Sequence, residues 1–203
     1  MKYLIAAFIV IIAVCIATSC GKRCVDAQYN FNMQEVFYPE KDSILVGETL
    51  FMESVHSTIF NDTLINKSID FSGSNIGSSL RLLRFPDNSS TVVGGMNDFE
   101  IHILEGNAPG NDNIPTENKG VFFTERNGNY RLKISLIAKQ KGIYAISLGD
   151  AIGIVEKRNS CEKANISIKN VNLNKNLYYY QNFFNGLPIN DYSKTHVYCF
   201  KVY

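Results

Sequence analysis

The sequence lacks the short motifs that mark the common enzyme classes. It has no Gly-x-Ser-x-Gly nucleophile elbow, no Gly-rich phosphate loop and no His-Glu-x-x-His zinc motif. It also has no Cys-x-x-Cys pair, and its three histidines do not cluster near the cysteines. We therefore expect no metal site, no cofactor and no enzymatic activity.

An excess of charge of either sign is missing too. The chain has 20 basic and 19 acidic residues, and removal of Lys2 with a cleaved leader makes the two numbers equal. A neutral chain offers no electrostatic reason to bind nucleic acid or an anionic lipid surface. Helical periodicity is absent after residue 20, which leaves strands as the expected elements.

The N-terminus carries a long apolar run. Met1 and Lys2 precede residues 3–16, which are almost entirely apolar, and small residues follow at 17–19. This order is typical of a secretory signal peptide. The alternative is a membrane-spanning helix, which needs about 20 apolar residues. Because the run is shorter than that and ends in polar residues, we assign residues 1–19 to a signal peptide.

Cys20 is the residue with the clearest predicted role. Ala17-Thr18-Ser19-Cys20 resembles a lipobox, the site at which bacteria attach diacylglycerol to a thiol, in the relaxed form common among Bacteroidota lipoproteins. The resemblance implies a lipid anchor at Cys20, with residues 20–27 as a tether, and more than one acyl chain makes such an anchor stable. The alternative is an ordinary secreted protein that is cleaved nearby.

The residues after Cys20 bear on the membrane and its leaflet. Gly21 resembles the outer-membrane signal of Gram-negative lipoproteins, whose inner-membrane members carry aspartate there. Gly21-Lys22-Arg23 differs from the acidic run that often follows the cysteine in surface-exported Bacteroidota lipoproteins. We therefore expect a lipid-anchored protein of the outer membrane, with the periplasmic face favoured over the cell surface.

Three cysteines remain after the leader and the lipid are assigned, namely Cys24, Cys161 and Cys199. In an oxidising periplasm two of them should pair. We predict a Cys161–Cys199 disulfide, because Cys24 lies in the tether and would lose more conformational freedom on pairing. A disulfide between Cys24 and either of the others is the alternative.

Residues 28–203 contain many short segments that alternate between apolar and polar side chains, which is typical of half-buried strands. Examples are residues 29–34, 98–104, 164–168 and 196–203. Asn127-Gly128 stands between two such segments and predicts a hairpin. These segments predict one all-β domain, an antiparallel sandwich of the immunoglobulin-like type, with residues 106–120 as a long surface loop.

Two stretches resemble bacterial immunoglobulin-like domains. Asp42-Ser43-Ile44-Leu45-Val46-Gly47-Glu48-Thr49-Leu50 is similar to their first strands, and Lys141-Gly142-Ile143-Tyr144-Ala145-Ile146-Ser147-Leu148 is similar to a late strand that follows a tight turn. The resemblance implies that the hydroxyl of a buried Tyr144 bonds back to the backbone at that corner. Residues 38–49, 132–150 and 195–202 also resemble a family of uncharacterised Bacteroidota lipoproteins, which brings no known activity.

Two groups of residues are candidate sites. Tyr178, Tyr179, Tyr180 and Tyr192 are candidates for a surface that stacks on sugars or peptides; the alternative is that about half of these rings fill the core. Asp42-Ser43-Ile44 and Asp62-Thr63-Leu64 match the short O-glycosylation signal of Bacteroidota exported proteins, which makes Ser43 and Thr63 candidates for modification. The alternative there is turn formation by the aspartates.

These observations predict a non-enzymatic envelope protein that binds or stabilises a protein or glycan partner, with membrane contact through its lipid anchor and no nucleic acid partner. The alternative is a small envelope hydrolase that acts on glycan or peptidoglycan. Its carboxylates would be distant in sequence, and no particular pair is indicated.

Overall fold

The computed structural model of the chain describes residues 28–86, 92–109, 118–158, 160–172 and 197–203. The predicted signal peptide over 1–19 and the tether over 20–27 lie outside the described residues. No helix in the described ranges is long and apolar enough to cross a membrane. The structure is all-β, as the sequence predicted, apart from one 3₁₀ turn, η1 (Met96–Asp98).

The strands form two larger sheets and one hairpin. The first sheet has the order β10-β11-β3-β1-β14-β13, and β8 pairs with β11. The second has the order β2-β15-β12-β6-β7, and β9 pairs with β6, while β4 and β5 pair with each other. The bounds are β1 (Gln28–Tyr38), β2 (Ser43–Ile44), β3 (Thr49–Ser57), β4 (Ile59–Asn61), β5 (Ser68–Asp70), β6 (Gly77–Phe85), β7 (Val93–Gly94), β8 (Phe99–Glu105), β9 (Asn118–Phe122), β10 (Thr124–Arg126), β11 (Asn129–Ala138), β12 (Gly142–Leu148), β13 (Val155–Glu156), β14 (Lys163–Asn170) and β15 (Tyr198–Val202).

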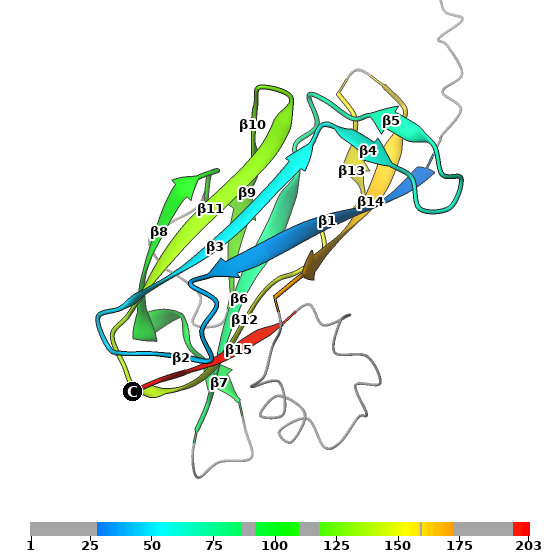
Figure 1. Cartoon of the computed structure of the whole chain (residues 1–203). Coiled ribbons are helices and arrows are strands. Elements are labelled where there is room, and N and C mark those ends of the chain that lie inside the picture. Colours follow the sequence, from blue (N-terminus) through cyan, green and yellow to red (C-terminus); the bar gives the residue numbers. More distant parts are fainter. Residues whose placement is uncertain (1–27, 87–91, 110–117, 159, 173–196) are drawn as a thin grey trace, which may run out of the picture.

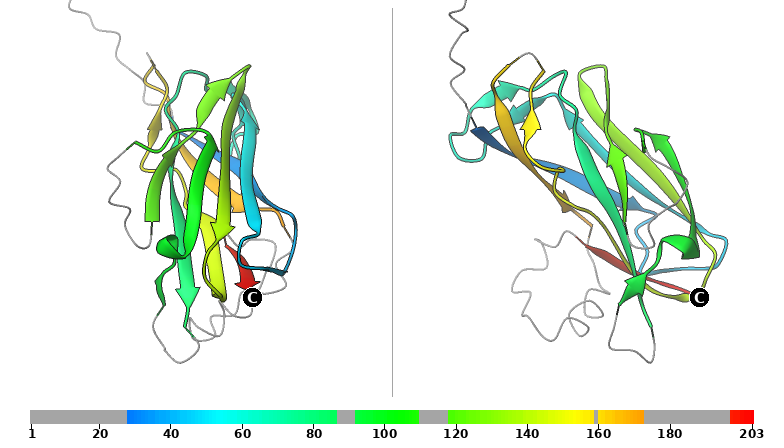
Figure 2. Two further views of the ribbon diagram at one scale, coloured as in Figure 1. Left: turned by 90° about the vertical axis from the view of Figure 1, so that its left-hand side faces the viewer. Right: turned by 180° about the vertical axis from the view of Figure 1, so that it is seen from behind.

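The two larger sheets form two layers that face each other, which Figure 2 shows edge-on. A single large apolar cluster takes side chains from both sheets, among them Phe31, Met52, Leu82, Tyr144 and Phe200. Burial of this cluster is the main favourable contribution to folding. Strand alternation explains which residues enter it, because every second side chain of a strand points to the same face.

Several local predictions are confirmed. Asn127 and Gly128 both have positive φ (52° and 71°) in the two-residue turn that joins β10 to β11, as a type I′ hairpin requires. Gly47, with φ of 88°, bends the chain between β2 and β3. The Tyr144 hydroxyl lies 3.0 Å from the Gln140 carbonyl oxygen and 3.1 Å from Asp98 Oδ2, so it bonds back to the backbone at the predicted corner.

The prediction of an antiparallel sandwich is wrong for two strand pairs. β1 runs parallel to β14, and β2 runs parallel to β15; Figure 1 shows β1 and β14 side by side. The physical reason is that these partners are far apart in the sequence, so no tight hairpin forces them to be antiparallel. The sheets are therefore mixed.

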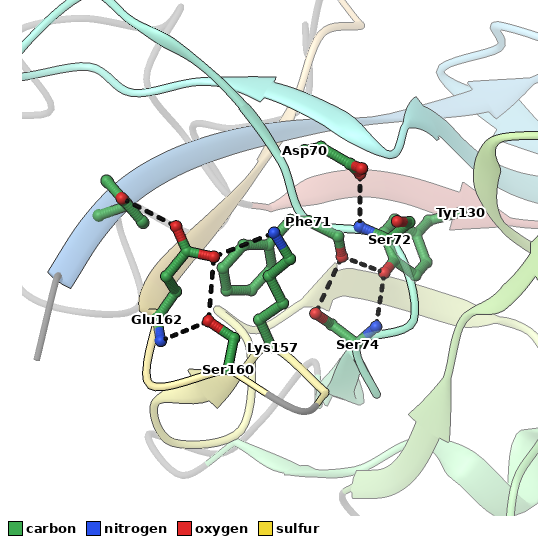
Figure 3. Close-up of polar contacts among 9 residues, drawn as sticks. Asp70, Phe71, Ser72, Ser74, Tyr130, Lys157, Ser160 and Glu162 are labelled. Carbon is green, nitrogen blue, oxygen red and sulfur yellow. Dashed lines mark hydrogen bonds and ion pairs between the residues drawn. The ribbon is translucent and has the colours of Figure 1, made fainter. Parts of the chain in front are cut away.

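Polar side chains fix the end of the sandwich at which β1 begins. The Tyr130 hydroxyl donates to the Phe71 carbonyl oxygen at 2.6 Å and accepts from Ser74 N at 3.0 Å (Figure 3). Burial raises the pKa of this phenol to about 12, so the hydroxyl keeps its proton at ordinary pH. The contact ties β11 to the segment between β5 and β6.

Glu35 is a carboxyl group inside the core. It belongs to the inward-facing row of β1, and it is fully buried. Its Oε2 accepts from Leu148 N at 3.2 Å, whereas Oε1 has no hydrogen-bond partner. Asn170, its register partner on β14, likewise has an unpartnered buried Nδ2. Burial raises the pKa of the Glu35 carboxyl to about 8, against the smaller opposite effect of the Leu148 bond.

Replacement of Glu35 by glutamine is expected to remove a pH dependence of stability. The folded state holds the Glu35 proton more tightly than the unfolded chain does. The contribution of this carboxyl group to the stability of the wild type is therefore greatest below pH 4.5, and it is lost as the pH rises towards 8. The loss amounts to about 1.4 kcal/mol for each unit that separates the two pKa values. Urea unfolding at pH 5 and pH 9 measures it.

Glu35→Gln should unfold at nearly the same urea concentration at both pH values. Glu156→Gln, at an exposed carboxyl of β13, is the matched control and should retain the wild-type pH dependence. Equal pH dependence in the wild type and Glu35→Gln would contradict a protonated, buried Glu35.

Candidate functional site

A cavity lined mainly by polar side chains lies across β1 and β14, and we name it the β1–β14 groove. Its volume is about 370 Å³. The lining residues come from the two strands and from the turns on either side, namely Asn30, Phe31, Asn32, Thr63, Asp150, Ala151, Gly153, Asn165, Ile166 and Ser167. Most of its functional groups are amides and hydroxyls, and one is a carboxylate.

The parallel register gives the groove its polar floor. Asn30 is level with Asn165, and Asn32 is level with Ser167. Because these positions alternate with the buried row, all four side chains share the outward face of the sheet. Asn165 Nδ2 donates to Asn30 Oδ1 at 3.2 Å, which leaves the other amide atoms of the pair directed to the groove or to solvent.

The turn at residues 62–66 forms one wall. The Asp62 carboxylate accepts three backbone N–H groups, from Asn30, Leu64 and Ile65, each at 2.8 Å. These bonds lower the pKa of Asp62, the bond from Ile65 most strongly, so the turn is held by a charged side chain. Leu64 and Ile65 point outward and are 76% and 60% exposed. The wall therefore presents apolar side chains at its tip.

Residues 150–154 form the opposite wall. Asp150 Oδ1 accepts from Ser167 Oγ at 2.8 Å and from Ile168 N at 3.2 Å. Its Oδ2 makes no hydrogen bond with the described residues, so it is available to a ligand. Ile152 and Ile154 of the same segment are 58% and 52% exposed. The groove thus has a polar floor between two turns, and the exposed aliphatic side chains of these turns lie outside its lining.

A cluster around Glu162 holds β1 and β14 together where the groove begins. Glu162 Oε1 accepts from the Tyr29 hydroxyl at 3.1 Å, and Oε2 lies 3.0 Å from Lys157 Nζ (Figure 3). Ser160 Oγ donates to the same Oε2. The bonds from Lys157, Ser160 and Tyr29 lower the pKa of Glu162, the Lys157 contact most strongly. Their combined effect is to fix the turn before β14 against the start of β1.

The chemistry of the groove favours uncharged, hydroxyl-rich ligands. Side-chain amides and hydroxyls both donate and accept hydrogen bonds, which matches the two roles of a sugar hydroxyl. The lining contains no Lys, Arg or His, so an anion would gain no charge partner there.

The two candidate O-glycosylation residues differ in access. Ser43 is half-buried in β2, which pairs with β15. Thr63 is exposed on the 62–66 turn, and its Oγ1 donates to the Asn30 carbonyl oxygen at 3.1 Å. Thr63 also lines the groove. Modification at either position stays a prediction, and Thr63 is the more accessible of the two.

The predicted Cys161–Cys199 disulfide is wrong. Cys199 is buried as a thiol in β15, where it packs with Leu83, Phe85 and Ala145 on the outward face of the second sheet. Cys161 precedes β14 of the first sheet, beside the Glu162 cluster. The two residues belong to different layers. The alternative pairings through Cys24 involve a residue outside the described part of the chain.

Other predicted residues also lie outside the described residues. These are the lipidation residue Cys20 and the candidate stacking residues Tyr178, Tyr179, Tyr180 and Tyr192. Of the predicted surface loop over 106–120, residues 110–117 lie outside. In the described ranges no group of three or more His, Cys, Asp or Glu side chains could hold a metal ion.

Sequence reasoning missed the groove residues on β1 and β14. Both strands were predicted from alternation, and their polar positions were visible as Asn30, Asn32, Asn165 and Ser167. A run of small amides and hydroxyls on one face of two strands is a signal for a polar surface. The sequence holds no signal for the parallel register that places the two rows side by side.

Comparisons with known proteins assign no family. No family profile matches the chain, and no curated protein matches it. Among solved structures, the reeler domain of human F-spondin is similar to it at 13% sequence identity, covering 73% of this chain and 99% of that domain, with a TM-score of 0.32. Because this TM-score is low, neither fold detail nor function is transferred from that domain.

Proposed function

We propose that this chain is a lipid-anchored protein of the bacterial outer membrane that binds a neutral glycan, without catalysis, in the β1–β14 groove. The observation that carries the proposal is the groove itself, whose polar lining consists of amide and hydroxyl side chains and a single carboxylate. The periplasmic face is the proposed location, and the residues around Cys20 support it.

The composition of the groove supports binding over hydrolysis. Asp150 is the one carboxylate in its lining, and it already accepts two hydrogen bonds. Glycosidases generally use two carboxyl groups on either side of the scissile bond. Glu35, whose raised pKa would suit a general acid, lies buried in the core and does not line the groove.

The finer type of the sandwich is part of the proposal. We propose an immunoglobulin-like scaffold, and two features support it. Tyr144 bonds to the backbone four residues earlier, as a tyrosine corner does. Gly47 bends the chain between β2 and β3, at the Gly-Glu-Thr stretch that resembles the first strands of such domains.

Asn32→Ala is expected to weaken glycan binding about 5- to 10-fold, because it removes donors and acceptors from the floor at a position that bonds to no other described side chain. Asn165→Ala should have a similar effect. Titration calorimetry with the neutral oligosaccharide that binds best in a panel measures both.

Gln34→Ala is the matched control, since Gln34 occupies the next outward position of β1 but does not line the groove. Its affinity should equal that of the wild type. Absence of binding to every neutral oligosaccharide, or an equal loss in Gln34→Ala, would contradict a glycan site in the groove. If the same face binds a protein instead, the ligand of the groove is a protein and not a glycan.

Cys20→Ser is expected to abolish incorporation of radiolabelled palmitate when the full chain is expressed in a Gram-negative host, because the thiol is the site of acylation. Cys24→Ser, four residues further along, is the matched control and should leave labelling unchanged. Persistent labelling of Cys20→Ser would show that this cysteine does not carry the lipid.

A further inference from the structure

A second cavity lies at the opposite end of β12 from Asp150, and we name it the basic cavity. Its volume is about 270 Å³. The end of β6, the start of β12 and the end of β15 form it, so it lies near the end of the chain marked C in Figure 1. Its lining residues are Arg84, Phe85, Pro86, Lys141, Gly142, Ile143, Lys201, Val202 and Tyr203.

The charged side chains of this cavity are all basic. Arg84, Lys141 and Lys201 line it, and no Asp or Glu does. Within the described part of the chain, the Lys141 and Lys201 ammonium groups have no carboxylate within ion-pair distance. The basic cavity therefore holds two cations that no described Asp or Glu side chain offsets, in a chain whose overall charge is close to zero.

Arg84 is held rigidly at the side of the cavity. Its Nη1 lies 3.6 Å from Asp98 Oδ2, and its Nη2 donates to the Lys141 carbonyl oxygen at 3.4 Å. With its amide oriented to satisfy both neighbours, Gln140 donates to Asp98 Oδ1 and accepts from Arg84 Nη1 at 2.9 Å. Asp98 offsets the charge of Arg84, and the hydrogen bond from Arg84 positions the Lys141 backbone. The net positive charge of the cavity therefore comes from Lys141 and Lys201.

Aromatic and aliphatic side chains also line the cavity. Lys201 Nζ lies 4.4 Å from the centre of the Tyr203 ring, which is a cation–π distance. Tyr203 N donates to Ile44 O, and its carbonyl oxygen accepts from Val46 N, which fixes the residue against the β2–β3 turn. Phe85 and Ile143 are level with Lys201 across three neighbouring strands. An apolar surface lowers the hydration around the two cations and strengthens their attraction for an anion.

From this arrangement we infer that the basic cavity binds an oxyanion group, phosphate or carboxylate, carried by a small ligand. Lysine is a common phosphate ligand because it acts as a compact point charge with three donors. Clefts of one charge sign concentrate counter-ions of the other sign. A neutral glycan would gain nothing from the two ammonium groups, so this site differs in ligand from the β1–β14 groove and does not depend on it.

The test uses inorganic phosphate and glucuronate as probes and glucose as the neutral comparison, with amide chemical shifts of the full-length mature protein as the readout. We expect millimolar binding of phosphate or glucuronate that shifts residues 84–86, 141–143 and 201–203. Lys141→Gln and Lys201→Gln should each weaken it at least fivefold. Raising NaCl from about 50 to 500 mM should weaken it too, because salt screens exposed charges.

Lys67→Gln is the matched control, since Lys67 is exposed on the turn at the other end of the molecule. Vesicles of phosphatidylglycerol distinguish the two sources of phosphate. If the wild type cosediments with the vesicles and both cavity variants do not, the oxyanion belongs to a lipid headgroup. If the protein binds only the free probes, the oxyanion belongs to a soluble ligand. Absence of binding to both probes and to vesicles, or an equal loss in Lys67→Gln, would overturn the inference.

Discussion

The parallel pairing of β1 with β14 is the constraint on which the rest of the structure depends. Its register is continuous from Gln28 and Lys163 to Glu35 and Asn170. One face of the pair buries Phe31 and Ile166 in the core, and the other face exposes the asparagines of the groove. A slip of one residue would exchange the two faces and expose the apolar row. Core and groove are therefore two results of the same register.

Side chains at both ends hold this pairing in place. At the start, Glu162 receives the Tyr29 hydroxyl. At the far end, the Asn172 side chain bonds to both the N–H and the carbonyl oxygen of Phe37, so it continues the ladder beyond β14. Between them lie Glu35 and Asn170, each with a buried polar atom that has no partner. Such groups cost stability.

Much of the fold could be predicted from local sequence. Alternation located the strands, Asn127-Gly128 predicted the hairpin between β10 and β11, and Tyr144 was predicted to bond to the backbone at the turn before β12. These signals act over a few neighbouring residues. The direction of β1 depends on β14, more than a hundred residues away, and the layer that contains Cys199 depends on its pairing with Ala145. The sequence holds no local signal for either. The sequence shows the asparagines of the groove, but it does not show that the parallel pairing brings them together, so the groove was not predicted.

The two cavities lie at opposite ends of β12 and differ in chemistry, since one is lined by amides and hydroxyls and the other by lysines. We propose that the first cavity, the β1–β14 groove, binds a neutral glycan. Titration of the isotope-labelled protein with a neutral oligosaccharide, followed by amide chemical shifts, tests it most directly. We expect shifts at residues 30–32, 63, 150–153 and 165–167. Shifts confined to residues outside these strands and turns, or none at any concentration, would contradict it.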